Sequence, residues 1–215
     1  MVPPFHANPD NHHCLQCTLR MALEALLPGQ DWSIDRLDRM THKRDGEGTW
    51  THGAYLAVGP LDIQTIAYDR FDYAAFIANP LLTVLNTFPA SVAHGMAQGF
   101  DLVAAAALAR ELVASDPVPL RTEPVTLEHL DTLLNEGYLL IVNVDMSTLD
   151  GGDQPSGHSV LVYDKQGEHY IAHDPGVRGK GVAGRRISSA DLEAAWSFMG
   201  EQHREVLALR GSTNE

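Results

Sequence analysis

Cysteine is scarce in this chain. Only two of the 215 residues are cysteines, Cys14 and Cys17, and they lie three positions apart. A disulfide between them would close almost no loop, so it would add little stability. Unpaired cysteines are typical of proteins in a reducing compartment.

Basic residues and long apolar runs are scarce as well. The chain has 15 Lys and Arg against 28 Asp and Glu, which gives a formal net charge of −13. A surface of this sign repels phosphate backbones. No run of about 18 apolar residues is present to span a membrane, and residues 1–6 lack the basic segment and apolar stretch of a secretory signal. We therefore expect a cytoplasmic protein whose partners include neither nucleic acid nor a membrane. The oligomeric state stays open.

The order of apolar patterns predicts an α+β fold. Residues 14–27 carry apolar side chains at helical spacing and end at Pro28-Gly29, whereas residues 138–144, 158–164 and 168–174 are β-rich. Further helices are predicted at 34–40, within 71–114, at 126–135 and at 188–198, with strands at 61–68 and 205–209. The length suffices for one core. We predict a single domain over residues 1–215, with a helical half at about 1–136, a sheet half at about 137–215, and a cleft between them.

Cys14 lies where the first predicted helix begins, directly after a polar segment. The free N–H groups and positive dipole end of a helix favour the thiolate over the thiol, and the thiolate is the nucleophilic form. Cys17 falls one turn further in. Its spacing relative to Leu15 and Leu19 favours a small buried side chain instead.

A hairpin in the second half places a histidine near an aspartate. We predict that Lys165-Gln166-Gly167 forms a three-residue loop with Gly167 at positive φ. Counting back along the ladder then sets His158 directly opposite Asp174, close enough for a hydrogen bond between the imidazole and the carboxylate. A two-residue loop would instead shift the register and turn the two side chains to opposite faces.

The order Cys14, His158, Asp174 is that of papain-like enzymes, with 144 residues from the cysteine to the histidine and 16 more to the aspartate. The segment CLQCTLRMAL, residues 14–23, resembles the catalytic helix of the bacteriocin-processing, double-glycine leader peptidases and their stand-alone relatives. Residues 157–161 (GHSVL) and 173–176 (HDPG) resemble the histidine and aspartate motifs of that family.

The resemblance implies a papain-like fold and a cysteine-nucleophile hydrolase or acyl transferase that acts on a peptide or amide bond through an acyl-thioester. Cys14 is then the nucleophile, His158 the general base, and Asp174 the residue that orients the base. Asn8 stands where the family has a glutamine that binds the oxyanion, with Asn11 as the other candidate. No cofactor is expected.

Two departures from the family leave an alternative open. Leu15 and Gln16 replace the glycine-containing pair that follows the nucleophile, and Asn8 is one methylene shorter than glutamine. A non-catalytic binding domain on the same fold is therefore the second hypothesis.

Several other residues are candidates for binding. We expect His13 to line the mouth of the site, and Gly157 and Trp50 to contact substrate. Trp50 lies in a predicted Gly-rich loop at 42–55 that also holds Tyr55. This loop is either a lid over the site or a loop held by a buried aromatic ring.

Two clusters of side chains contain residue types that bind metal ions. His6, His12 and His13 precede the two cysteines, but their spacing fits no familiar zinc site, and a full ligand set would consume the nucleophile. A second, acidic cluster lies before His158 and could bind a cation or a polar substrate, or form a solvated turn. It consists of Asn143, Asp145, Asp150 and Asp153. We predict no metal site.

Overall fold

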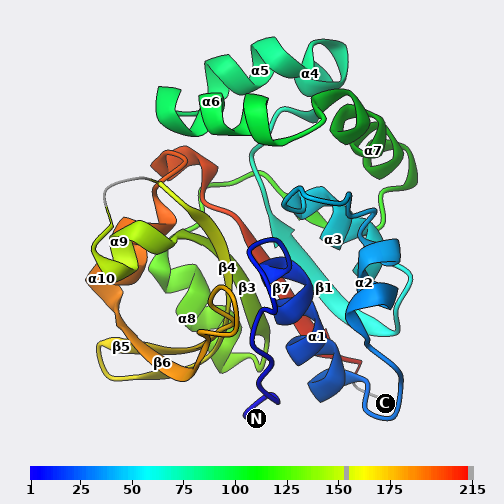
Figure 1. Ribbon diagram of the computed structural model, residues 1–215. Coiled ribbons are helices and arrows are strands. Elements are labelled where there is room, and N and C mark those ends of the chain that lie inside the picture. The colour runs from blue at the N-terminus through cyan, green and yellow to red at the C-terminus, as the bar shows by residue number, and fades with distance from the viewer. Residues whose placement is uncertain (153–154, 213–215) are drawn as a thin grey trace.

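The computed structural model describes residues 1–152 and 155–212, and its centre is one seven-stranded sheet (Figure 1). The strands are β1 (Ile63–Tyr68), β2 (Leu120–Arg121), β3 (Leu139–Asp145), β4 (Gly157–Gln166), β5 (His169–Asp174), β6 (Val182–Ser188) and β7 (Val206–Gly211). Their order in the sheet is β2-β1-β7-β3-β4-β5-β6. All neighbouring pairs are antiparallel except β1 and β2.

Helices surround this sheet. They are α1 (Cys14–Leu26), α2 (Ile34–Met40), α3 (Thr51–Val58), α4 (Tyr73–Ala78), α5 (Pro80–Thr87), α6 (Ala90–Gly99), α7 (Leu102–Ser115), α8 (Leu127–Asn135), α9 (Met146–Asp150) and α10 (Ser189–Trp196). The α+β class is as predicted. A helix that begins at Cys14 packs against a mainly antiparallel sheet, and this prediction is confirmed as well.

The sheet draws strands from both sides of the predicted boundary near residue 137. The last strand, β7, pairs with β1 on one side and β3 on the other, so it joins the early strands to the later ones. Strand β6 and the short β2 were not predicted. The predicted loop at 42–55 is wrong from Thr51 onward, because α3 begins there and buries Tyr55.

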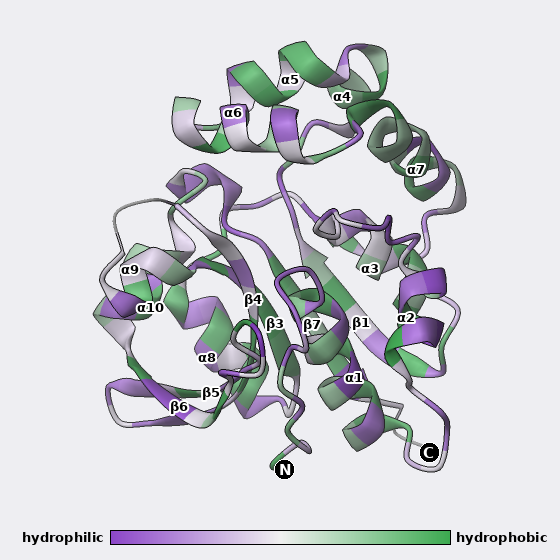
Figure 2. Cartoon of the chain, viewed as in Figure 1, coloured by the Kyte–Doolittle hydropathy of each residue, from purple (hydrophilic) through white to green (hydrophobic). Residues whose placement is uncertain are grey.

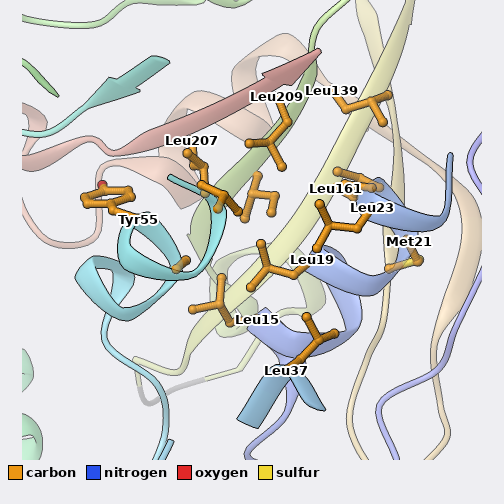
Figure 3. Packing of buried hydrophobic residues seen from close by; sticks show 14 of the residues in the cluster. Leu15, Leu19, Met21, Leu23, Leu37, Tyr55, Leu139, Leu161, Leu207 and Leu209 are labelled. Atoms are coloured by element: carbon orange, nitrogen blue, oxygen red, sulfur yellow. The ribbon is translucent and has the colours of Figure 1, made fainter. Parts of the chain in front are cut away.

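Helix α1 lies on one face of the sheet and buries its apolar stripe there (Figure 3). Leu19 and Leu23 are fully buried, and they belong to one core cluster with strand residues Leu161 and Leu207. Replacing a leucine in such a core with alanine typically costs about 2–5 kcal/mol. This packing fixes α1 on the sheet and therefore the position of Cys14 at its first turn.

The opposite face of the sheet is covered by α8 and α10. Their apolar residues form a second cluster with β3 and β4 around Trp196. Apolar colouring follows the central strands and the packed faces of the helices (Figure 2). Because both faces are covered, β3 and β4 are rich in Val, Ile and Leu rather than strictly alternating.

A third apolar cluster lies beyond one end of the sheet, where α4, α5, α6 and α7 pack together (Figure 1). It is centred on Phe76, Val84 and Ala109, and Phe198 and Met199 join it from the segment after α10. Within residues 1–152 and 155–212, no single helix is long and apolar enough to cross a membrane. The bent pair α6 and α7 passes that test only when the two helices are taken together.

Candidate active site

Cys14 is the first residue of α1 and is half-buried. Burial raises the pKa of its thiol, but hydrogen bonds to His158 and Ser159 and the charge of His158 outweigh this effect. The pKa therefore lies below the ordinary value of 9.0. Cys17 behaves in the opposite way, because burial and the neighbouring Cys14 raise its pKa to about 12. The pKa values of the two thiols thus shift in opposite directions, and only that of Cys14 is lowered.

His158 is the second residue of β4 and is buried. Its Nε2 lies 2.7 Å from Oδ1 of Asp174, which leaves Nδ1 as the ring nitrogen available to Cys14. Burial lowers the pKa of His158, but the hydrogen bonds to Asp174 and Cys14 outweigh it and raise the pKa to about 9. The opposite shifts at Cys14 and His158 favour a thiolate beside an imidazolium.

Asp174 ends β5 and is almost fully buried. Besides the imidazole, Oδ1 accepts a hydrogen bond from the backbone N–H of Gly176, and Oδ2 accepts one from Nη1 of Arg185, each at 2.8 Å. Burial raises the pKa of Asp174, but these partners and the charge of His158 hold it below its ordinary value. The carboxylate is therefore fully partnered and has little freedom to rotate.

The hairpin that carries these two residues differs from the predicted register. The turn is the two-residue Gly167-Glu168, since Gln166 pairs with His169. A predicted positive φ at Gly167 is present, at +60°. Such a loop alone would put His158 and Asp174 on opposite faces.

A β-bulge at Tyr163 reverses that effect. Asp164 pairs with Ile171, but Val162 pairs with Ala172, so one extra residue of β4 lies between them. His158 and Asp174 return to one face as diagonal neighbours rather than as a directly opposed pair. The predicted three-residue loop and direct opposition are therefore wrong, whereas the predicted contact is present through a different register.

Asn8 is fully buried, and its backbone is hydrogen-bonded to the loop that follows Asp174. Its N–H donates to Pro175 O at 2.8 Å, and its carbonyl accepts from Gly179 N–H at 2.7 Å. Its side-chain Oδ1 accepts from the N–H of Asp10. Its Nδ2 is buried and has no hydrogen-bond partner among the described residues.

The predicted binding residues fall into two groups. Trp50 and Gly157 line a cavity that also contains Cys14 and His158. His13 is outside this lining, because its two ring nitrogens are engaged by carboxylates of Asp10 and Asp38. Its neighbours in sequence line the cavity instead, and these are Asn11 and His12.

Sequence reasoning did not identify a polar chain that runs from the thiol into the protein. The backbone N–H of Ser159 faces the thiol of Cys14 as a hydrogen-bond donor. Its Oγ donates to Asn143 Oδ1 at 2.8 Å. Asn143 Nδ2 donates to both Thr51 and Glu205 at 2.9 Å. Burial and the nearby Asp69 raise the pKa of Glu205 to about 8. Two sequence signals were present: Ser159 stands beside His158 in the GHSVL segment, and Asn143 belongs to the acidic cluster before His158.

The acidic cluster before His158 has structural partners. Asp145 caps α9 and accepts hydrogen bonds from Ser147, Thr148 and Ser156, and Asp150 pairs with Arg185. Asp153 lies outside the described residues. Within residues 1–152 and 155–212, no three His, Cys, Asp or Glu side chains are gathered so that they could hold a metal ion.

Fold and site together define an α+β protein in which a thiol at a helix start meets a histidine and an aspartate from adjacent strands. No protein-family model matches the chain, and no curated protein sequence matches it. A solved structure of the peptidase domain of Streptococcus ComA, a bifunctional ABC transporter involved in a quorum-sensing pathway, is similar to it. The two chains are 16% identical, the match covers 98% of this chain and 97% of that one, and the TM-score is 0.48.

Proposed function

We propose that this protein is a papain-like cysteine hydrolase or acyl transferase that acts on a peptide or amide bond. The observation that carries the proposal is that Cys14 and His158, which contact each other, have pKa values shifted in opposite directions. The thiol of Cys14 has a lowered pKa, and His158, held by Asp174 at 2.7 Å, has a raised one. A thiolate–imidazolium pair is the reactive form of a cysteine nucleophile.

The proposed reaction has two steps. The thiolate of Cys14 attacks the substrate carbonyl, and an S–C bond forms while the carbonyl oxygen takes the electron pair. The intermediate collapses, the C–N bond breaks, and Nδ1–H of His158 protonates the departing amine. Water or a second amine then attacks the thioester, His158 accepts its proton, and the thiolate leaves.

Asn8 and the backbone N–H of Cys14 are the proposed donors to the oxyanion. The buried Nδ2 of Asn8 has no hydrogen-bond acceptor within the described part of the chain. Leaving a buried donor without an acceptor costs free energy, so an acceptor supplied by the substrate would offset this cost and supports the role. The first N–H groups of a helix also have no partner within that helix. Asn11 is the alternative side-chain donor, since it lines the cavity beside Cys14.

Asp174 is the proposed positioning residue for the base. Its hydrogen bond to Nε2 fixes which ring nitrogen faces the thiol, and its charge stabilises the imidazolium. Arg185 and the Gly176 N–H hold the carboxylate in turn.

The peptide or amide substrate is proposed from the resemblance of the three motifs to the double-glycine leader peptidases. Two further proposals follow from composition. The net charge of −13 argues against nucleic acid as a partner, and two free cysteines favour the cytoplasm.

Trapping the acyl-enzyme tests the proposal. The protein is mixed with a panel of N-acetyl aminoacyl p-nitrophenyl esters, and its intact mass is followed with and without glycinamide as acceptor. We expect an acyl adduct on Cys14 that is absent in Cys14→Ala and retained in Cys17→Ala. Release into water indicates a hydrolase, and release onto glycinamide a transferase. A protein that forms no adduct at Cys14 with any ester is a binding domain, and the proposal then fails.

A further inference from the structure

The cavity at Cys14 extends well beyond the three reactive side chains. Its volume is about 310 Å³, and it is bounded on one side by the thiol of Cys14 and the imidazole of His158. The far side is built by α6 and the segments around it, which lie above the end of the sheet (Figure 1). The third apolar cluster therefore supplies a wall of the candidate active site.

That wall is mainly aromatic. Its large side chains include Trp50, Phe71, Phe88, Met96, Phe100 and Phe198. The rings are packed against one another, with 5.4 Å between the centroids of Trp50 and Phe100 and 5.8 Å between those of the stacked Phe71 and Phe88. Because these rings pack against one another, they form an apolar surface that exists before a ligand binds.

The cavity also lacks fixed charge beyond the reactive pair. Among the described residues that line it there is no Lys or Arg, and the one carboxyl group is Glu205. Burial raises the pKa of Glu205 to about 8, so this group is mostly uncharged at neutral pH. A charged substituent would therefore lose its hydration here without gaining an opposite charge.

The size of the cavity limits what it can hold. Ligand pockets span about 300–1,000 Å³, so about 310 Å³ suits one aromatic or branched aliphatic group and not an extended peptide. Two glycines would leave it unfilled, and no apolar surface would be buried against the rings.

We propose that this cavity is a specificity pocket for a bulky, uncharged apolar group, bound within a few bonds of the carbonyl that Cys14 attacks. The inference rests on the proposed function and names its substrate class. Substrates with an aromatic or branched aliphatic side chain next to the scissile bond are preferred over those with a double glycine.

Helix α6 offers a matched pair of variants. Gly95 lines the cavity, and a Cβ at that position would meet nothing within 4 Å. Gly99 lies one turn further along the same helix with equally open space, outside the cavity lining. Leucine at either position also improves helix propensity, so Gly95→Leu should fill the cavity and Gly99→Leu should not. Ser91→Leu is a second filling variant from the same helix.

The test uses N-substituted chloroacetamides, in which the thiolate of Cys14 forms an S–C bond and displaces chloride. The N-methyl, N-benzyl and N-(2-carboxyethyl) compounds are compared by the second-order rate of labelling at Cys14. We expect N-benzyl to label at least tenfold faster than N-methyl, and the carboxylate compound to show no such advantage. Gly95→Leu and Ser91→Leu should lose most of the advantage of N-benzyl over N-methyl, whereas Gly99→Leu should match the unaltered protein.

Two failures are distinguishable. If N-methyl chloroacetamide labels Cys14 rapidly but N-benzyl has no advantage in the unaltered protein, the pocket inference is overturned and the proposed nucleophile stands. The pocket inference is overturned in the same way if both filling variants keep the full N-benzyl advantage. If the N-methyl compound labels Cys14 no faster than an ordinary thiol, the proposed function itself fails.

Discussion

His158 and Asp174 meet as diagonal neighbours on adjacent strands, with 2.7 Å between Nε2 and Oδ1. Two irregularities produce this contact together. The tight turn at Gly167 shifts the register by one residue, and the bulge at Tyr163 shifts it back. Bulges commonly re-aim side chains next to active sites, and here the bulge returns the imidazole to the face that carries the carboxylate.

The turn glycine should matter for stability rather than for chemistry. Gly167 has a φ of +60°, and a Cβ added there would meet nothing within 4 Å. Gly167→Ala should therefore lower the free energy of unfolding by about 1–2 kcal/mol through backbone strain alone. Urea denaturation measures this, with Gly99→Ala at a helical φ as the control. A loss of equal size in the control would show that positive φ is not the cause.

Asp174→Asn tests the positioning role of the carboxylate. Asparagine keeps the shape but removes the charge that stabilises the imidazolium, so the pKa of His158 should fall from about 9 toward its ordinary 6.5. The pKa of Cys14 should rise in response. Histidine NMR titration gives the first shift directly. A pKa for His158 that stays near 9 would assign the stabilisation to another group.

Arg185 should act on the site through Asp174. Its guanidinium donates to Asp174 Oδ2, Asp150 and the carbonyl of Leu149. Arg185→Met leaves half of a buried carboxylate unpaired, and we expect at least a tenfold loss in the rate of acyl transfer to Cys14. Arg186→Met is the matched control, because Arg186 is exposed and contacts Gln166. Equal losses in the two variants would point to a general effect of charge.

Glu205 should make stability depend on pH. Its pKa is raised from 4.5 to about 8, first by burial and then by Asp69. The folded state thus binds more protons than the unfolded state between these values, and stability should fall as pH rises from about 4.5 to 8. Glu205→Gln removes this dependence while keeping an acceptor for Thr51. Urea midpoints of the unaltered protein and of Glu205→Gln at pH 5 and pH 8 measure this dependence. If stability changed equally with pH in both proteins, Glu205 would not be the group responsible.

The local parts of the fold were predictable from sequence because their signals are local. The apolar spacing after Cys14 gave α1, and Thr126 gave the start of α8, where its capping box with His129 is present. The register was not predictable, since a bulge leaves no mark in an apolar strand. Arg185 and Glu205 reach the site from β6 and from the segment before β7, and such long-range contacts have no counterpart in sequence spacing.

The aromatic wall of the cavity also depends on long-range contacts that the sequence does not predict. Trp50 was predicted to contact substrate, but the rings that surround it come from positions between 71 and 100 that carry no recognisable motif. Their gathering at Cys14 depends on how α4 to α7 pack, and that packing is a property of the whole chain.

The most direct test of the thiolate–imidazolium pair is the pH dependence of iodoacetamide alkylation at Cys14, measured in a Cys17→Ala background with and without His158→Ala. With His158 present, we expect the midpoint of alkylation to lie below the 9.0 of an ordinary thiol, because the imidazolium holds the thiol ionised, and a second change near pH 9 as the imidazole loses its proton. His158→Ala should move the midpoint to that of an ordinary thiol, near 9. A midpoint near 9 in both proteins would contradict the ion pair and with it the proposed chemistry.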